Sequence, residues 1–147
     1  MSARILGPQA SDSRLPLNAP QRLTEQSFRQ GDVPAVRRFT RAFGLRTGFG
    51  PGRLDDFVLA VSEAAACATV VGPCTARVRL WVTGTRAFCE IRGNGVLLRR
   101  SARGTAAGGR PGEEEALRRS VLRQLSDYVS IASGADGVRV QLSMRVA

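Results

Sequence analysis

The clearest periodic pattern in the chain is an apolar stripe at helical spacing between residues 53 and 70. The stripe consists of six residues at positions i, i+3, i+4, i+7, i+11 and i+14: Leu54, Phe57, Val58, Val61, Ala65 and Ala68. Glu63 lies nearly opposite, and its neighbours on that side are Leu59, Ala60, Ala66 and Cys67. Because a helix surface that faces bulk water is normally polar, this second side is predicted to be covered, or to line a pocket that holds one carboxylate.

Alternating polar and apolar residues predict β-strands on both sides of this helix. Residues 76–82 and 86–92 alternate with period two across a turn at 83–85, which predicts a hairpin. Residues 22–28 can form an edge strand. Residues 128–132 and 138–146 can form a final hairpin.

Two further helices complete the predicted elements. One begins with Asp32 as N-cap and Pro34 in the first turn, and it ends at Gly44. The other runs from residue 113 to about 129, and four residues are expected on its core face: Leu117, Val121, Leu125 and Tyr128. This order of elements predicts an α+β fold, a two-layer sandwich with helices packed on one face of a mixed or antiparallel sheet.

Composition along the chain predicts one domain with a leader and a lid. Residues 1–20 mix proline, serine and glycine without periodicity, so we expect a disordered leader before a single domain at residues 21–147. Residues 93–112 are rich in glycine and arginine and contain no acidic residue, which is typical of a long loop that acts as a lid.

Charge and rare residue types exclude several kinds of chemistry. The chain has 22 cationic residues, all arginine, and no lysine or histidine, which excludes Ser-His-Asp triads, His-ligated metals and Schiff-base lysines. Net charge is +5 over residues 1–50 and +7 over residues 70–112, which favours an acidic partner. Because only 5% of residues are aromatic, we do not expect binding of single-stranded nucleic acid. Three cysteines without CxxC spacing and the lack of a long apolar run predict reduced thiols in a cytoplasmic protein away from membranes.

Three short motifs carry a resemblance to a known family. They are VPAVRRF at 33–39, LDDFVLAVSE at 54–63 and CEIRGNG at 89–95, and residues 117–146 match the expected closing helix and strands. With them, residues 21–146 resemble the anti-sigma-factor serine-kinase branch of the histidine-kinase-like (GHKL) ATPase superfamily. The resemblance implies that family's ATPase fold, and it implies that Glu63 matches the family's general base.

The motifs also depart from the family at each nucleotide-binding element. Cys67 stands where the family has the Asn that holds Mg²⁺, and a thiol is a poor ligand for a hard cation. Gly93 stands where the family has its adenine-binding Asp, although Gly95 is retained and Asn94 is a candidate substitute. Residues 113–115 are all glutamate in the first turn of a helix where phosphates would bind, and Arg110 can offset only one of them.

The sequence therefore predicts a degenerate nucleotide site and a function without catalysis. We expect a regulatory protein that resembles an anti-sigma factor, needs no cofactor, and binds a sigma factor or an anti-sigma-factor antagonist. A homodimer is also compatible with the resemblance. Arg99, Arg100 and Arg103 are the candidate contacts with an acidic partner. The unused pocket is expected to be filled by four side chains: Leu59, Cys67, Val71 and Leu97.

Two alternatives stay open at this point. One is an active ATP-dependent serine kinase that binds ATP and Mg²⁺ and uses Glu63 as its general base. The other is an arginine-rich nucleic-acid-binding module, whose affinity for DNA would fall steeply with salt.

Overall fold

The computed structural model describes residues 21–69, 75–94, 111–135 and 137–147. The first half contains β1 (Gln21–Arg29), α1 (Val33–Leu45), α2 (Arg53–Ala68) and β2 (Thr75–Thr83). The second half contains β3 (Arg86–Gly93), α4 (Pro111–Leu125), β4 (Tyr128–Gly134) and β5 (Gly137–Arg145). The predicted leader at residues 1–20 and most of the predicted lid lie outside the described residues.

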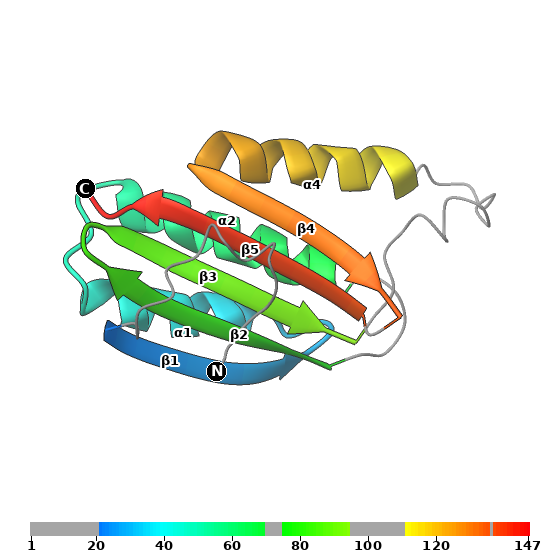
Figure 1. Cartoon of the computed structure of the whole chain (residues 1–147), viewed down its shortest axis with the longest axis horizontal. Helices are drawn as coiled ribbons and strands as arrows, with labels where there is room; N and C mark the ends of the chain where they lie inside the picture. Colours follow the sequence, from blue (N-terminus) through cyan, green and yellow to red (C-terminus); the bar gives the residue numbers. More distant parts are fainter. Residues whose placement is uncertain (1–20, 70–74, 95–110, 136) are drawn as a thin grey trace.

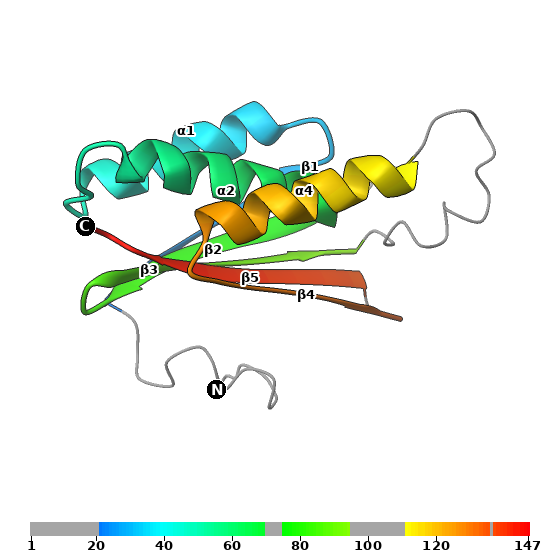
Figure 2. The same cartoon turned by 90° about the horizontal axis from the view of Figure 1, so that it is seen from above.

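In this part of the chain, the strands form one antiparallel sheet in the order β1-β2-β3-β5-β4. The three helices lie together on one side of this sheet, and α2 lies between α1 and α4 (Figure 1, Figure 2). The predicted α+β sandwich with helices on one face is therefore confirmed, and the sheet is antiparallel throughout its described strands.

The two N-terminal helices begin and end close to their predicted limits. Asp32 occupies the N-cap position of α1 and Pro34 lies in the first turn, but the Asp32 side chain makes no capping hydrogen bond. Gly52 immediately precedes α2 and has a φ of 80°. This left-handed backbone conformation favours glycine, which accounts for the residue type at this position. Of the predicted stripe on α2, five residues are buried: Phe57, Val58, Val61, Ala65 and Ala68.

The core lies between the helices and the sheet face that they cover. Alternate residues of the central strands point into it, among them Leu80, Ile91 and Leu142, which are fully buried. Phe57 of α2 packs against Phe43 and Phe49, with ring centroids 6.2 and 5.0 Å away. This packing fixes α2 over the sheet.

The α4 helix differs from its prediction in both extent and orientation. It ends at Leu125 rather than near Val129, because the carboxylate of Asp127 accepts a hydrogen bond from the Arg145 backbone N–H at 2.8 Å and the following residues pair with β5. Among the α4 residues whose burial is described, Leu122 is fully buried, and Leu125, which was expected in the core, packs against the buried core residues. Leu117, which was also expected in the core, is 65% exposed. Of the described helices, none is long and apolar enough to cross a membrane.

Candidate functional site

The candidate nucleotide-binding residues that the structure describes lie on the C-terminal half of α2 and at the end of β3. Glu63 and Cys67 lie one helical turn apart on α2. Gly93 is the last residue of β3, and it contacts the backbone of Ala68, the last residue of α2. The structure thus places Gly93, to which the resemblance assigns the adenine contact, against the end of the helix that carries Glu63 and Cys67.

The end of β3 leaves no space for a side chain at position 93. A Cβ atom added to Gly93 would lie 2.6 Å from the carbonyl oxygen of Ala68 and 3.4 Å from the Ala68 Cβ. The closest obstacle is a backbone atom at the end of a packed helix, so it cannot be relieved by a rotamer change. An aspartate at this position would therefore require α2 and β3 to move apart.

Glu63 is held by an arginine from the neighbouring helix. The Nε atom of Arg118 on α4 lies 3.6 Å from Oε1 of Glu63, and the two side chains are 34% and 29% exposed. The side of α2 that was predicted to be covered is therefore covered in part by α4, which lies beside α2 in Figure 2. Ala60 and Cys67 on this side are buried, whereas Leu59 is exposed. A general base must reach the proton that it removes, and here a guanidinium occupies one side of the carboxylate.

The thiols of the described residues are buried. Cys67 is 3% exposed and Cys89 on β3 is fully buried, and neither is in a disulfide. Burial raises the pKa of the Cys89 thiol well above its usual value, and the charge of Glu90 raises it further. Such a thiol is inert rather than nucleophilic. Cys74 lies outside the described residues.

The other predicted site residues are either engaged elsewhere or not described. Asn94, the candidate substitute for the missing aspartate, is exposed, and its Oδ1 accepts a hydrogen bond from the Thr75 backbone N–H at 3.0 Å. Leu59 does not fill a pocket, because 44% of it is exposed. Seven of the predicted residues lie outside the described part: Val71, Gly95, Leu97, Arg99, Arg100, Arg103 and Arg110. Both ends of the predicted lid belong to regular elements, since β3 continues to Gly93 and α4 begins at Pro111.

Sequence reasoning did not find the charged cluster on the sheet face opposite the helices. Glu90 of β3 is 3% exposed and accepts a hydrogen bond from Nε2 of Gln141 at 3.1 Å. Its carboxylate oxygens also lie 3.5 Å from Arg79 NH1 and 3.4 Å from Arg92 NH2. The signal was present in the alternation of the hairpin, which places Arg79 and Glu90 opposite one another in the register.

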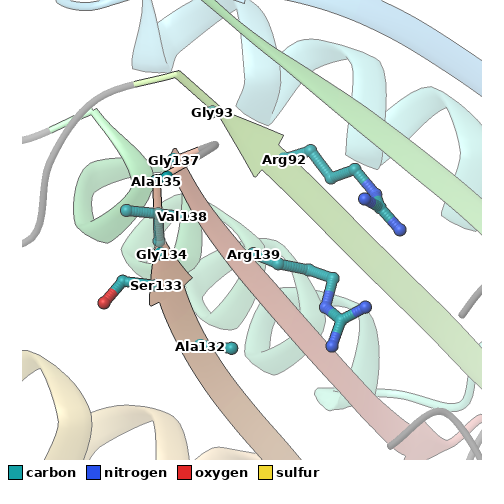
Figure 3. A pocket seen from close by; sticks show the side chains of 9 residues that line it. All are labelled: Arg92, Gly93, Ala132, Ser133, Gly134, Ala135, Gly137, Val138 and Arg139. Carbon is teal, nitrogen blue, oxygen red and sulfur yellow. The ribbon is translucent and has the colours of Figure 1, made fainter. Parts of the chain in front are cut away.

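Arginines dominate one end of this same face. The register aligns Arg77 with Arg92 and Arg92 with Arg139, which gives a row of three arginines across β2, β3 and β5. We call these three residues the arginine row. Like charges directly opposite one another in a sheet are destabilising, and Glu25 offsets part of this repulsion through a 3.0 Å contact with Arg77. Figure 3 shows that Arg92 and Arg139 extend in the same direction from adjacent strands, beside the turn between β4 and β5.

Comparison with known protein families and with curated proteins gave no match. No protein-family model matches the chain, and no curated protein matches it at a significant level.

Proposed function

We propose that this protein is a non-catalytic regulator that acts by binding another protein, on a scaffold that resembles the histidine-kinase-like ATPases. The resemblance to anti-sigma factors makes a sigma factor or an anti-sigma-factor antagonist the expected partner. The observation that carries the proposal is the contact between Gly93 and the Ala68 carbonyl, because it removes the space for the family's adenine-binding carboxylate.

Two further observations support the same proposal. The ion pair between Glu63 and Arg118 engages the only carboxylate that the resemblance offers as a base. Cys67, at the position of the family's metal ligand, is a buried thiol and a poor ligand for Mg²⁺. A nucleotide would therefore lack its adenine contact and its metal ligand, and it would meet a base that is already engaged.

Calorimetric titration of the full chain with Mg·ATP tests this proposal. We expect no binding at millimolar nucleotide, and the same result for Arg118→Ala, because releasing Glu63 leaves the Gly93 contact unchanged. Micromolar binding by the natural chain that is lost in Glu63→Gln would refute the proposal and favour an active kinase. Binding that appears only in Arg118→Ala would also contradict it, since α4 would then be masking an intact nucleotide site.

A further inference from the structure

The sheet face opposite the helices, which we call the helix-free face, carries two stacked aromatic rings. Trp81 of β2 and Phe88 of β3 are register partners, and their ring centroids lie 5.5 Å apart with 9° between the ring planes. Alternation along the strands puts both side chains on this face, because their neighbours Leu80 and Cys89 lie in the core. Both rings are nonetheless buried, since Trp81 is 7% exposed and Phe88 is 5% exposed.

The described helices and strands leave this aromatic pair open to the outside. The three helices lie on the other side of the sheet, and Figure 2 shows no labelled element over the helix-free face. Side chains of a sheet stand roughly perpendicular to it, so stacked rings shield each other's faces and leave their outer edges uncovered. Thr83, next to the pair on β2, and Ser143, opposite Phe88 on β5, are too small to reach over a ring edge.

Two long side chains beside the pair are engaged with carboxylates. Arg79 lies 3.5 Å from Glu90, and Arg86 lies 3.3 Å from Asp127, as measured between nitrogen and oxygen. Their guanidinium groups are therefore not directed over the rings. The burial of the aromatic pair thus requires a further segment on the helix-free face.

Buried polar atoms on the same face indicate that this segment has a peptide backbone. Oγ1 of Thr83 and Oε1 of Gln141 are buried without a hydrogen-bond partner, although Nε2 of Gln141 donates to Glu90. Buried acceptors without a donor are unfavourable, and a peptide segment supplies backbone N–H groups at regular intervals. A purely apolar covering surface would leave both acceptors unpaired.

The chain that precedes β1 joins the sheet beside the aromatic pair. Gln21, the first residue of β1, is the register partner of Val82, which follows Trp81. Neighbouring strands are about 4.8 Å apart, so β3 lies about 10 Å from β1. Ten extended residues span up to about 33 Å. Residues 11–20 are therefore long enough to turn back and cross β1, β2 and β3.

The longer segments outside the described residues join the sheet farther away. Residues 70–74 lead into Thr75, and residues 95–110 follow Asn94, at the opposite end of the β2–β3 hairpin. Trp81 comes six positions after Thr75 on β2, which corresponds to about 20 Å at 3.3 Å per residue. Residues 11–20 are therefore the nearest available part of the chain.

We propose that residues 11–20 fold back across the helix-free face and pack Leu15, Pro16 and Leu17 on the Trp81–Phe88 pair. The segment reads SDSRLPLNAP, so two leucines flank a proline. Extended proline-containing segments bind aromatic surfaces at a low entropy cost, because their conformation is already restricted. Composition alone predicts disorder for residues 1–20, whereas the buried aromatic pair assigns their second half a docked position.

This docking goes beyond the proposed function and does not rest on it. With residues 11–20 in place, the helix-free face is occupied from within the chain. A partner protein would then bind on the helix-bearing side, or it would first have to displace this segment.

The fluorescence of Trp81, the single tryptophan of the chain, tests the docking in the full-length protein. We expect the emission of a buried indole and weak quenching by acrylamide. Leu15→Ser combined with Leu17→Ser should shift the emission to longer wavelength and increase the quenching constant several-fold. Ile5→Ser combined with Leu6→Ser changes two similar residues outside the proposed segment and should leave both values unchanged.

A second measurement needs no substitution. Nuclear Overhauser contacts between the Trp81 ring and leucine methyl groups are recorded in the natural chain with ¹³C-labelled methyl groups. We expect contacts from Trp81 to the methyl groups of Leu15 and Leu17. The backbone amide spectra of both double variants should keep the dispersed signals of the sheet, because the substituted residues precede β1.

Three results would overturn the inference. Ready quenching of Trp81 in the natural chain would show that the helix-free face is open and available to another protein. Protection that persists in the Leu15 and Leu17 double variant would assign the covering segment to another part of the chain. Protection that is lost on dilution, together with a fall in sedimenting mass, would show that a second copy covers the pair.

Discussion

Replacing Gly93 by alanine tests the contact between the end of β3 and the end of α2. The added Cβ would lie 2.6 Å from the Ala68 carbonyl oxygen, so the end of α2 or the end of β3 must shift. Overpacking of this kind costs about 1–3 kcal/mol. At a glycine with open space and ordinary φ, the same replacement instead stabilises a protein by about 0.4–1 kcal/mol, because it restricts the unfolded chain. A loss of stability in Gly93→Ala would therefore indicate the contact with Ala68, and a gain would indicate open space at position 93.

Gly134 supplies the matched control, because it also lies in a strand and an added Cβ there would meet no atom within 4 Å. Urea unfolding followed by the fluorescence of Trp81, the single tryptophan, measures both variants. With an m-value of about 2 kcal/mol/M, Gly93→Ala should lower the midpoint by about 0.5–1.5 M. Gly134→Ala should leave the midpoint unchanged or raise it slightly. A Gly93→Ala protein as stable as the natural chain would refute the reasoning, since α2 would not then pack against β3 as described.

Three further predictions concern packing, hydrogen bonding and pH. Leu122→Ala should lower the free energy of unfolding by about 2–5 kcal/mol, because Leu122 is fully buried. Leu117→Ala should change it by less than about 0.5 kcal/mol, because Leu117 is 65% exposed. Equal effects of the two substitutions in urea unfolding would contradict the orientation of α4. Asn94→Ala should cost about 0.5–1.5 kcal/mol by removing the 3.0 Å bond from the Thr75 N–H, and a neutral result would show that this bond does not form in solution. The pKa of the Cys89 thiol is raised in the folded protein, so the unfolded chain loses this proton at a lower pH than the folded protein does. The free energy of unfolding should therefore be unaffected by this group below the ordinary thiol pKa of about 8.5, and above it should fall by up to about 1.4 kcal/mol per pH unit. Cys89→Ala should show a shallower loss between pH 8.5 and 10, and identical slopes would contradict the burial of this thiol.

Periodicity was sufficient to predict the fold class and most of the elements. The apolar stripe on α2 and the alternation in the β2–β3 hairpin both depend on local spacing, and both appear in the structure near the predicted positions. Gly84, with φ of 61°, occupies the predicted turn of that hairpin.

The errors in α4 arise from contacts that local spacing does not encode. The predicted pattern Leu117, Val121 and Leu125 shares Leu125, which does pack against the core, with a second pattern, Arg118, Leu122 and Leu125, that also recurs at helical spacing. The second pattern faces the core because α4 packs beside α2, where Arg118 meets Glu63. A helical pattern that contains an arginine is not normally assigned to a buried face, so the sequence favoured the wrong side.

The sequence assigned the candidate residues to a helix and to the end of a hairpin, but it could not predict how these elements pack. Glu63 and Cys67 lie on α2, and Gly93 at the end of β3 packs against Ala68, the last residue of that helix. The Gly93–Ala68 contact and the partner of Glu63 depend on how α2 packs against β3 and α4, which are distant in the sequence. The arginine row was also not predicted, because it depends on the register between three strands.

The central claim is that this chain has no working nucleotide site, and residue-specific binding of Mg·ATP tests it most directly. Backbone amide signals of residues 60–69, 91–94 and 118–122 are recorded while Mg·ATP is added to several millimolar. We predict no saturable change at Ala68, Gly93 or Glu63. Saturable shifts at these three residues with a micromolar midpoint would contradict the account and establish a functional nucleotide site between α2 and β3.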